Sequence, residues 1–366
     1  MNKILLNGLH YEKNGAGISN YTKNLIHTFI KDEYPVDILL RGEFGDKYKG
    51  ENIIHVDKVL PSSAKRIIQE QWTSKHLYKA YDLVHFPDYA TPVFYQGHKV
   101  ATIHDMAMHT MRDKYTRMQN VTKNTLLQAT IRSASHLICD SEFTKKELCS
   151  YYPNLAADIS VIHLGIESPR LLVDDRKAKD ILARLGITHK YLLYVGTIAP
   201  HKNIVQLIKA FYEIKKIHKE YKLVIAGKKG WMYEEVFNQV SVLGLEEEVV
   251  FTGFVDELEL EALYKEAEFY VSLSLYEGFG LPPLEAMIRG CPVLVSNLEI
   301  FKETCSDSAL FCSPADLEEI VRGMRSLIEH QDLRNQLREK GQVRVKQFTW
   351  EKTARRTYEV YQSVLK

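Results

Sequence analysis

A short apolar run, Phe269–Leu273, leads directly into Tyr276-Glu277-Gly278-Phe279-Gly280-Leu281-Pro282-Pro283-Leu284-Glu285-Ala286-Met287. The two glycines let the backbone pass close to a ligand. The two prolines favour a helix start, where a missing N–H costs nothing. A strand, a glycine loop and a helix in this order predict a βα unit of a parallel sheet. The N–H groups at the helix start form a natural seat for phosphate.

The same alternation of apolar runs and helical patterns extends along the whole chain. Seven candidate strands precede residue 170, namely Lys3–Asn7, Val36–Leu40, Ile53–Val56, Leu83–Phe86, Val100–His104, His136–Cys139 and Val161–Leu164. Six more follow it, namely Tyr191–Gly196, Lys222–Ala226, Val249–Thr252, Phe269–Leu273, Pro292–Val295 and Ala309–Cys312. Such a series predicts an α/β fold with parallel, doubly wound sheets covered on both faces.

A polar connection between about Glu167 and Lys190 interrupts the series. We therefore expect two Rossmann-like domains, one spanning residues 1–170 and the other residues 171–349. Ligands of such sheets bind at the carboxyl ends of the strands, so we expect a ligand cleft between the two domains.

Composition and charge narrow the class of protein. A chain of 366 residues with 45% hydrophobic and 26% charged residues is an ordinary globular protein of two domains. The formal net charge of +1 gives no general attraction to nucleic acid. No stretch approaches the ~20 apolar residues of a membrane span. The five cysteines form no C-x-x-C pair and are expected to be reduced, so we expect a cytoplasmic location.

Glu277 and Glu285 flank the glycine loop with seven residues between them. One precedes the loop and the other lies early in the helix, so both can face one bound molecule. Carboxylates accept hydrogen bonds well from the hydroxyls of sugars and ribose. The alternative is that Glu285 only complements the helix dipole and that Glu277 is a solvated loop residue.

A second loop follows the predicted strand that ends at Gly196. It reads Gly196-Thr197-Ile198-Ala199-Pro200-His201-Lys202-Asn203, and a helical pattern begins after it. Lys202 would place a point charge beside a diphosphate, and His201 would add a donor or, if protonated, a second charge. The alternative is a surface loop with an incidental lysine.

Two further signals lie in the N-terminal half. Gly15-Ala16-Gly17 resembles half of a dinucleotide fingerprint, but the third glycine position is Asn20. We interpret it as a flexible loop facing the cleft, and a plain strand–helix turn is the alternative. His104 follows a predicted strand, and a histidine at the carboxyl end of a parallel strand points into a cleft more often than into a core.

Two absences bear on the chemistry. The chain has no D-x-D, so no carboxylate pair is available to hold Mg²⁺ or Mn²⁺ against a diphosphate. It also has no G-x-x-x-x-G-K-[ST], which argues against P-loop phosphoryl transfer. We therefore expect no metal and no cofactor, with Lys202 and backbone N–H groups neutralising the diphosphate.

On these residues the chain resembles the retaining glycosyltransferases of family 4, which have the GT-B architecture of two facing Rossmann-like domains. Glu277 through Glu285 is similar to the family's E-x7-E motif. The stretch Gly253-Phe254-Val255-Asp256-Glu257 is similar to its nucleotide-base loop. One departure is His201, where many members place an arginine. The resemblance extends to Trp350, and it implies that the last helix, within 350–366, crosses back onto the N-terminal domain.

The resemblance implies a role for each site residue. Glu277 would contact the hydroxyls of the donor sugar, and Glu285 those of the ribose. Lys202 would hold the diphosphate together with backbone N–H groups of Gly278, Phe279, Gly280 and Leu281. Gly15 and Gly17 would close over the phosphates, and His104 would lie beside the donor sugar and the acceptor.

The donor and acceptor are less sharply defined. The sequence of the glycine loop favours GDP-mannose as the donor, with UDP-glucose or a UDP-N-acetylhexosamine as alternative donors. The resemblance to the family implies a glycan or lipid-linked acceptor in surface polysaccharide synthesis. Peripheral contact with the inner face of a membrane would use two basic clusters. The first cluster is Lys65, Arg66, Lys75 and Lys79, which lie beside the apolar residues Ile67, Ile68, Trp72 and Leu77. The second cluster is Arg112, Lys114, Arg117 and Lys123. Ordinary solvated helix faces are the alternative.

A sugar-nucleotide epimerase, a nicotinamide oxidoreductase and a non-catalytic sugar-binding protein are the rival functions.

Overall fold

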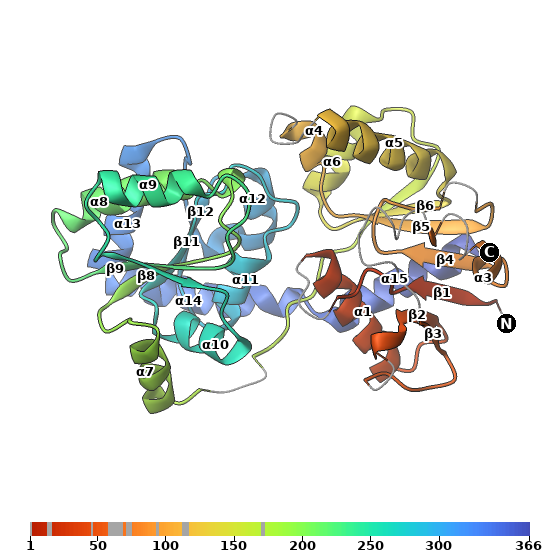
Figure 1. Cartoon of the computed structure of the whole chain (residues 1–366), viewed down its shortest axis with the longest axis horizontal. Helices are drawn as coiled ribbons and strands as arrows, with labels where there is room; N and C mark the ends of the chain where they lie inside the picture. The colour runs from red at the N-terminus through yellow and green to blue at the C-terminus, as the bar shows by residue number, and fades with distance from the viewer. Residues whose placement is uncertain are drawn as a thin grey trace. The chain divides into compact units, whose positions relative to one another are not determined.

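The computed structural model describes residues 2–12, 17–44, 47–57, 69–70, 75–92, 95–111, 117–169 and 173–366. The chain divides into two units, each with its own parallel sheet (Figure 1). Unit 1 comprises Met1–Gly165 and Thr349–Lys366, and unit 2 is the continuous stretch Ile166–Phe348.

The sheet of unit 1 has the strand order β3-β2-β1-β4-β5-β6-β7, and all its pairs are parallel. Its strands are β1 (Ile4–Asn7), β2 (Asp37–Arg41), β3 (Ile53–Val56), β4 (Leu83–Phe86), β5 (His98–Ile103), β6 (His136–Cys139) and β7 (Asp158–Val161). The strand order reverses between β1 and β4, which places a topological switch point there.

The helices in the described part of unit 1 bury apolar residues. They are α1 (Ile18–Lys31), α3 (Lys75–Tyr78), α4 (Ala107–Thr110), α5 (Arg117–Ser133), α6 (Glu142–Tyr151) and α15 (Trp350–Val364). The last of these packs beside α1 (Figure 1). Its Tyr361 hydroxyl lies 2.5 Å from Nδ1 of His85 on β4, and Nε2 of that ring lies 2.8 Å from Oγ1 of Thr102 on β5. The C-terminal helix is thus tied to the interior of unit 1.

The sheet of unit 2 has the order β10-β9-β8-β11-β12-β13, again all parallel. Its strands are β8 (Tyr191–Val195), β9 (Lys222–Ala226), β10 (Val249–Gly253), β11 (Phe269–Ser272), β12 (Val293–Ser296) and β13 (Leu310–Cys312). Here the order reverses between β8 and β11, whose register pairs Leu192 with Phe269.

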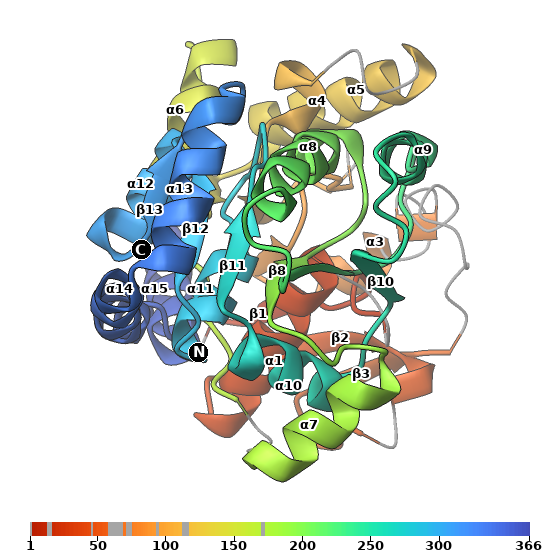
Figure 2. The ribbon, with the colours of Figure 1, turned by 90° about the vertical axis from the view of Figure 1, so that its left-hand side faces the viewer.

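Helices cover both faces of this second sheet. They are α7 (Asp175–Arg184), α8 (Ile204–Lys215), α9 (Glu234–Val242), α10 (Glu257–Glu266), α11 (Leu281–Ile288), α12 (Glu299–Cys305), α13 (Leu317–Glu329) and α14 (Gln331–Arg344). Apolar residues of α8, α9 and α13 share one buried cluster with alternate residues of the strands, including Leu192, Leu223 and Val271. The pairs α7–α10 and α11–α14 pack together (Figures 1 and 2).

The predicted fold class is confirmed, and twelve of the thirteen predicted strands overlap their counterparts by most of their length. The prediction for the last strand of the first series, Val161–Leu164, is wrong, because β7 spans Asp158–Val161. This edge strand carries Asp158 and Ser160, so it lacks the apolar run that marks a buried strand. The five cysteines are unpaired, and Cys149 is the exposed one.

Within the described ranges, no helix combines the length and the apolar character that a membrane crossing requires.

Candidate active site

The switch point of the sheet in unit 2 brings the two strongest sequence motifs together. The loop Gly196–Lys202 leaves the carboxyl end of β8, and the loop 273–280 leaves that of β11, the adjacent strand. The Leu275 N–H donates a 2.7 Å hydrogen bond to the His201 carbonyl, which links the two loops. Phosphate and sugar ligands of doubly wound sheets bind at this position.

Lys202 and Glu277 contact one another across this switch point. Nζ of Lys202 donates to Oε1 of Glu277 at 2.5 Å, and the two side chains are 16% and 15% exposed. The hydroxyl of the buried Ser274 donates to the same Oε1 at 2.7 Å. The Ser274 hydroxyl itself lies 3.2 Å from that of Ser272. The carboxylate of Glu277 is thus fixed by a cation and a hydroxyl.

Helix α11 begins directly after this pair with no capping side chain. Its N-cap is Gly280, and Pro282 lies in the first turn, as predicted from the sequence. Gly280 has φ +83°, and a Cβ there would lie 2.6 Å from Cε1 of Phe301, so only glycine fits without strain. The side chain of Phe279 is buried against Phe348. Gly278, Phe279 and Leu281 can therefore serve a ligand through their backbone.

Glu285 lies on α11, one turn beyond its start, and is half-buried. Its Oε2 lies 3.5 Å from the hydroxyl of Tyr264 on α10. Burial raises the pKa of the carboxyl group, while the positive charge of Arg289 acts in the opposite direction.

His201 stacks on Trp231, with ring centroids 5.2 Å apart and an angle of 18° between the planes. Burial, together with the neighbouring charge of Lys202, lowers the pKa of His201 to about 4. Of the two roles considered from the sequence, this lowered pKa favours a neutral donor or acceptor over a second positive charge near neutral pH. Thr197, in the same loop, is exposed, and Gly196 continues the sheet by donating to the Ala226 carbonyl.

Phe254 and Val255 follow β10, whose carboxyl end lies at the same edge of the sheet. Phe254 is 65% exposed, and Nζ of Lys228 lies 4.5 Å from the centroid of its ring. Lys228 and Trp231 belong to the loop after β9, which sequence reasoning missed. The sequence Gly227-Lys228-Lys229-Gly230-Trp231 directly after a predicted strand was the signal that could have found them.

His104 lies in unit 1, directly after β5. Its Nδ1 is 2.6 Å from Oδ2 of Asp140, and its Nε2 is 2.9 Å from the Pro87 carbonyl. Both partners offer acceptor oxygens, and this arrangement favours a proton on each ring nitrogen and hence a cationic ring. Burial alone would lower the pKa of His104, but the charge and the hydrogen bond of Asp140 raise it to about 9.

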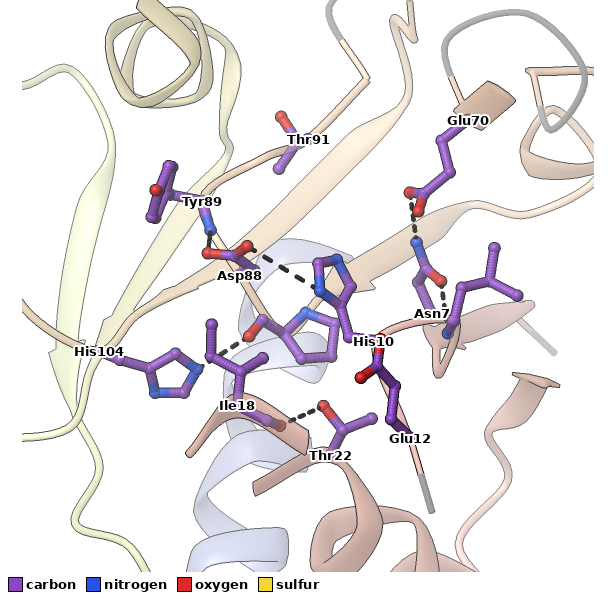
Figure 3. A network of polar contacts seen from close by, with 12 residues as sticks. Asn7, His10, Glu12, Ile18, Thr22, Glu70, Asp88, Tyr89, Thr91 and His104 are labelled. Atoms are coloured by element: carbon purple, nitrogen blue, oxygen red, sulfur yellow. Dashed lines mark hydrogen bonds and ion pairs between the residues drawn. The ribbon is translucent and has the colours of Figure 1, made fainter. Parts of the chain in front are cut away.

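The switch point of unit 1 carries further polar residues. Nδ1 of His10 and Oδ2 of Asp88 approach to 3.9 Å, with His104 nearby on the adjacent strand end (Figure 3). Gly17, with φ +54°, precedes the first residue of α1. Gly15 lies outside the described residues, as do Lys65–Ile68, Trp72, Arg112 and Lys114 of the two basic clusters.

The two halves of the chain match two family models. The model described as Glycosyltransferase Family 4 matches residues 15–170, and the one described as Glycosyl transferases group 1 matches residues 179–344. O-antigen chain mannosyltransferase B of Escherichia coli is 28% identical over 279 residues, which cover 75% of this chain and 73% of that protein.

Solved structures show the same fold at lower sequence identity. Sucrose-phosphate synthase from Thermosynechococcus elongatus has a TM-score of 0.80 and 19% identity, covering 100% of this chain and 99% of its own. Anabaena HepE in complex with UDP and glucose has a TM-score of 0.77 and 17% identity, covering 99% and 100%. With both halves matched by the models and the fold matched over the full length, the chain belongs to glycosyltransferase family 4 and has the GT-B fold.

Proposed function

We propose that this family 4 glycosyltransferase transfers mannose from GDP-mannose to a glycan or lipid-linked saccharide, with retention and without a metal ion. The acceptor belongs to the synthesis of a cell-surface polysaccharide. The observation that carries the proposal is the Lys202–Glu277 contact at the switch point of unit 2, directly before the uncapped start of α11.

The geometry of this contact suits two adjacent parts of one donor. A diphosphate needs a cation and backbone N–H groups, which Lys202 and the start of α11 supply. The sugar attached to that diphosphate needs hydroxyl acceptors, which Glu277 supplies. Because the two side chains touch, a phosphate beside Lys202 leaves the anomeric sugar within reach of Glu277.

In the proposed reaction, the bond between the anomeric carbon and the leaving diphosphate breaks while the acceptor oxygen bonds to the same face of that carbon. The diphosphate takes the proton of the acceptor hydroxyl. Negative charge grows on the leaving group, and the ammonium of Lys202 stabilises it. His104, whose pKa is raised by Asp140, is the residue of unit 1 proposed to serve the donor sugar and the acceptor.

The choice of mannose is supported by relatives such as the E. coli O-antigen chain mannosyltransferase B. A UDP-sugar donor is the second candidate. HepE was solved with UDP and glucose, and at 17% identity it shares the fold with this chain.

The proposal includes peripheral contact with a membrane, where a lipid-linked acceptor would be met. On α5, Met118 is 80% exposed and Val121 is 61% exposed, one helical turn apart, and Arg117 and Lys123 lie on the same helix. Apolar side chains beside basic ones favour the surface of an anionic membrane. We expect co-flotation with vesicles of phosphatidylglycerol, and its loss in Met118→Ser combined with Val121→Ser. Equal recovery with neutral phosphatidylcholine vesicles would contradict this part.

Nucleotide binding and release test the transferase itself. We expect GDP and GDP-mannose to raise the melting temperature in the presence of EDTA, more than UDP-glucose or UDP-N-acetylglucosamine does. GDP release from GDP-mannose should require acceptor, which separates a transferase from an epimerase and from a binding protein. Binding of none of these nucleotides would overturn the proposal, and a glycosyl-enzyme trapped on a side chain would overturn the same-face mechanism.

A further inference from the structure

A buried ion pair lies behind Glu285 in unit 2. Arg289, four residues after Glu285, donates from Nε to Oε1 of Glu261 on α10 at 2.8 Å, and its Nη2 contacts the same oxygen. The side chains of Arg289 and Glu261 are only 10% and 7% exposed. A third donor of the guanidinium, Nη1, reaches the backbone carbonyl of Glu285 at 3.0 Å.

This arrangement is poorly explained by stability alone. Taking two charges out of water costs several kcal/mol for each ion, so a buried pair is often no more stabilising than apolar residues of similar volume. The guanidinium is nonetheless held on several sides, since it also lies over the ring of Tyr264 with its carbon 5.2 Å from the centroid. The same Tyr264 presents its hydroxyl to Oε2 of Glu285.

The charged groups around Glu285 show how the guanidinium of Arg289 can act on its carboxyl group. Glu285 is surrounded by Arg289 on its own helix, by Tyr264 and Glu261 on α10, and by Glu167 at the start of unit 2. Burial raises the pKa of the Glu285 carboxyl group, Glu167 and Glu261 raise it further, and Arg289 and the Tyr264 hydroxyl lower it. Arg289 is the cation in this set, so it opposes the burial and the two like charges.

We propose that Arg289 is a positioning residue of the nucleotide site, which keeps Glu285 a carboxylate facing the ribose, and that Glu261 fixes Arg289 for this task. The inference rests on the proposed function, because it takes the ribose hydroxyls as the partners of Glu285. An ionised carboxylate accepts hydrogen bonds from both hydroxyls of a ribose, whereas a protonated carboxyl group loses acceptor capacity. Arg289 thereby acts on the ligand through Glu285.

A purely structural role predicts a different result. Arg289 also ends α11 by donating to a carbonyl, and cations at helix C-termini stabilise helices. Arg338 does a comparable task at the same helix end, because its Nε donates to the Gly290 carbonyl at 2.7 Å. It is absent from the charges that act on Glu285, so Arg338→Met is the matched control.

The experiment is calorimetric titration of GDP and of UDP into the full chain, from about pH 5 to about pH 8. In the wild type, affinity should fall as the pH falls through the pKa of Glu285. In Arg289→Met this fall should move to higher pH, with roughly tenfold weaker binding at about pH 6 and recovery at higher pH. Arg338→Met should keep the wild-type midpoint. Glu261→Gln removes a like charge but keeps an amide oxygen that can accept from Arg289, so it should not move the midpoint upward.

Arg289→Lys, which keeps the charge, should remain close to the wild-type midpoint and serves if Arg289→Met does not fold. If Arg289→Met binds as the wild type does, with the same midpoint, the inference is overturned while the proposed function stands. If Arg289→Met does not fold, a midpoint that moves upward in Arg289→Lys has the same meaning. An equal loss of affinity at every pH assigns Arg289 a structural role and also overturns it. Absence of GDP and UDP binding by the wild type overturns the proposed function, and this inference with it.

Discussion

Lys202 and Glu277 are 75 positions apart in the sequence, and their charged atoms lie 2.5 Å apart in unit 2. The contact exists because β8 and β11 are neighbours in the sheet although β9 and β10 separate them in the chain. Each side chain is largely shielded from water, so neither charge is an ordinary surface group.

Replacing Lys202 by alanine should lower turnover by roughly a hundredfold or more, because charge on the leaving diphosphate loses its stabilising cation. The affinity for GDP should fall as well. Lys216→Ala, which removes an exposed lysine paired with Glu213 on α8, is the control and should leave both unchanged. Steady-state release of GDP measures the effect, and an unchanged rate in Lys202→Ala would remove Lys202 from the site.

Asp140→Asn should flatten the pH dependence of stability on the alkaline side. The pKa of His104, raised to about 9 against the depression caused by its burial, exceeds the unfolded value of 6.5. The resulting stability, at most on the order of 3 kcal/mol, is fully present below pH 6.5 and is lost as the pH rises through about 9.

Chemical denaturation at several pH values measures this difference. Asp105→Asn is the control, since Asp105 accepts from the Ala107 N–H and does not contact the His104 ring. A wild type whose free energy of unfolding does not decline between these pH values would contradict the assignment of a cationic His104.

His201→Arg should tighten the binding of GDP by about tenfold, through one added charge-assisted hydrogen bond to the diphosphate. A planar guanidinium can keep the stacking contact with Trp231. In the wild type, titration of His201 should contribute nothing between pH 6 and pH 8, because its pKa is lowered to about 4 by burial and by Lys202. Competition titrations with His201→Ala separate the charge from the stacking, and weaker binding by the arginine variant would be the contrary result.

Gly280→Ala should destabilise unit 2 by about 3 kcal/mol or more, from left-handed backbone strain and collision with Phe301 together. Gly244→Ala isolates the strain, because Gly244 has φ +63° with open space around it, and it should cost about 1 kcal/mol. Equal costs for the two variants would show that the start of α11 relaxes away from Phe301.

The fold was predictable because its buried parallel strands are unbroken apolar runs. β8, β9 and β11 are the clearest cases, and even the predicted ends of these strands lie close to the observed ends. Edge strand β7 was misplaced because only one of its four residues is fully buried. The pattern of apolar residues does not reveal such a strand, because its position is set by pairing with β6.

The candidate site was predictable where glycine, proline and charge coincide, as at Glu277–Glu285 and at Lys202. Partners supplied by other elements were not. Asp140 reaches His104 from the end of β6, and Glu261 reaches Arg289 from α10. Sheet order and helix packing create these pairings, and no spacing in the sequence encodes them. For the same reason, the lowered pKa of His201 follows from burial that a single sequence does not display.

The bond between Tyr361 and His85 has a consequence for the order of events during synthesis. Unit 2 is one uninterrupted stretch, so every residue of its sheet has been synthesised before the closing helix that follows Phe348. Unit 1 starts first but cannot satisfy the buried imidazole of His85 until Trp350–Val364 has been made. The unit that is translated first is therefore completed last, and a chain that ends after Phe348 would hold all of unit 2 but lack the helix that completes unit 1.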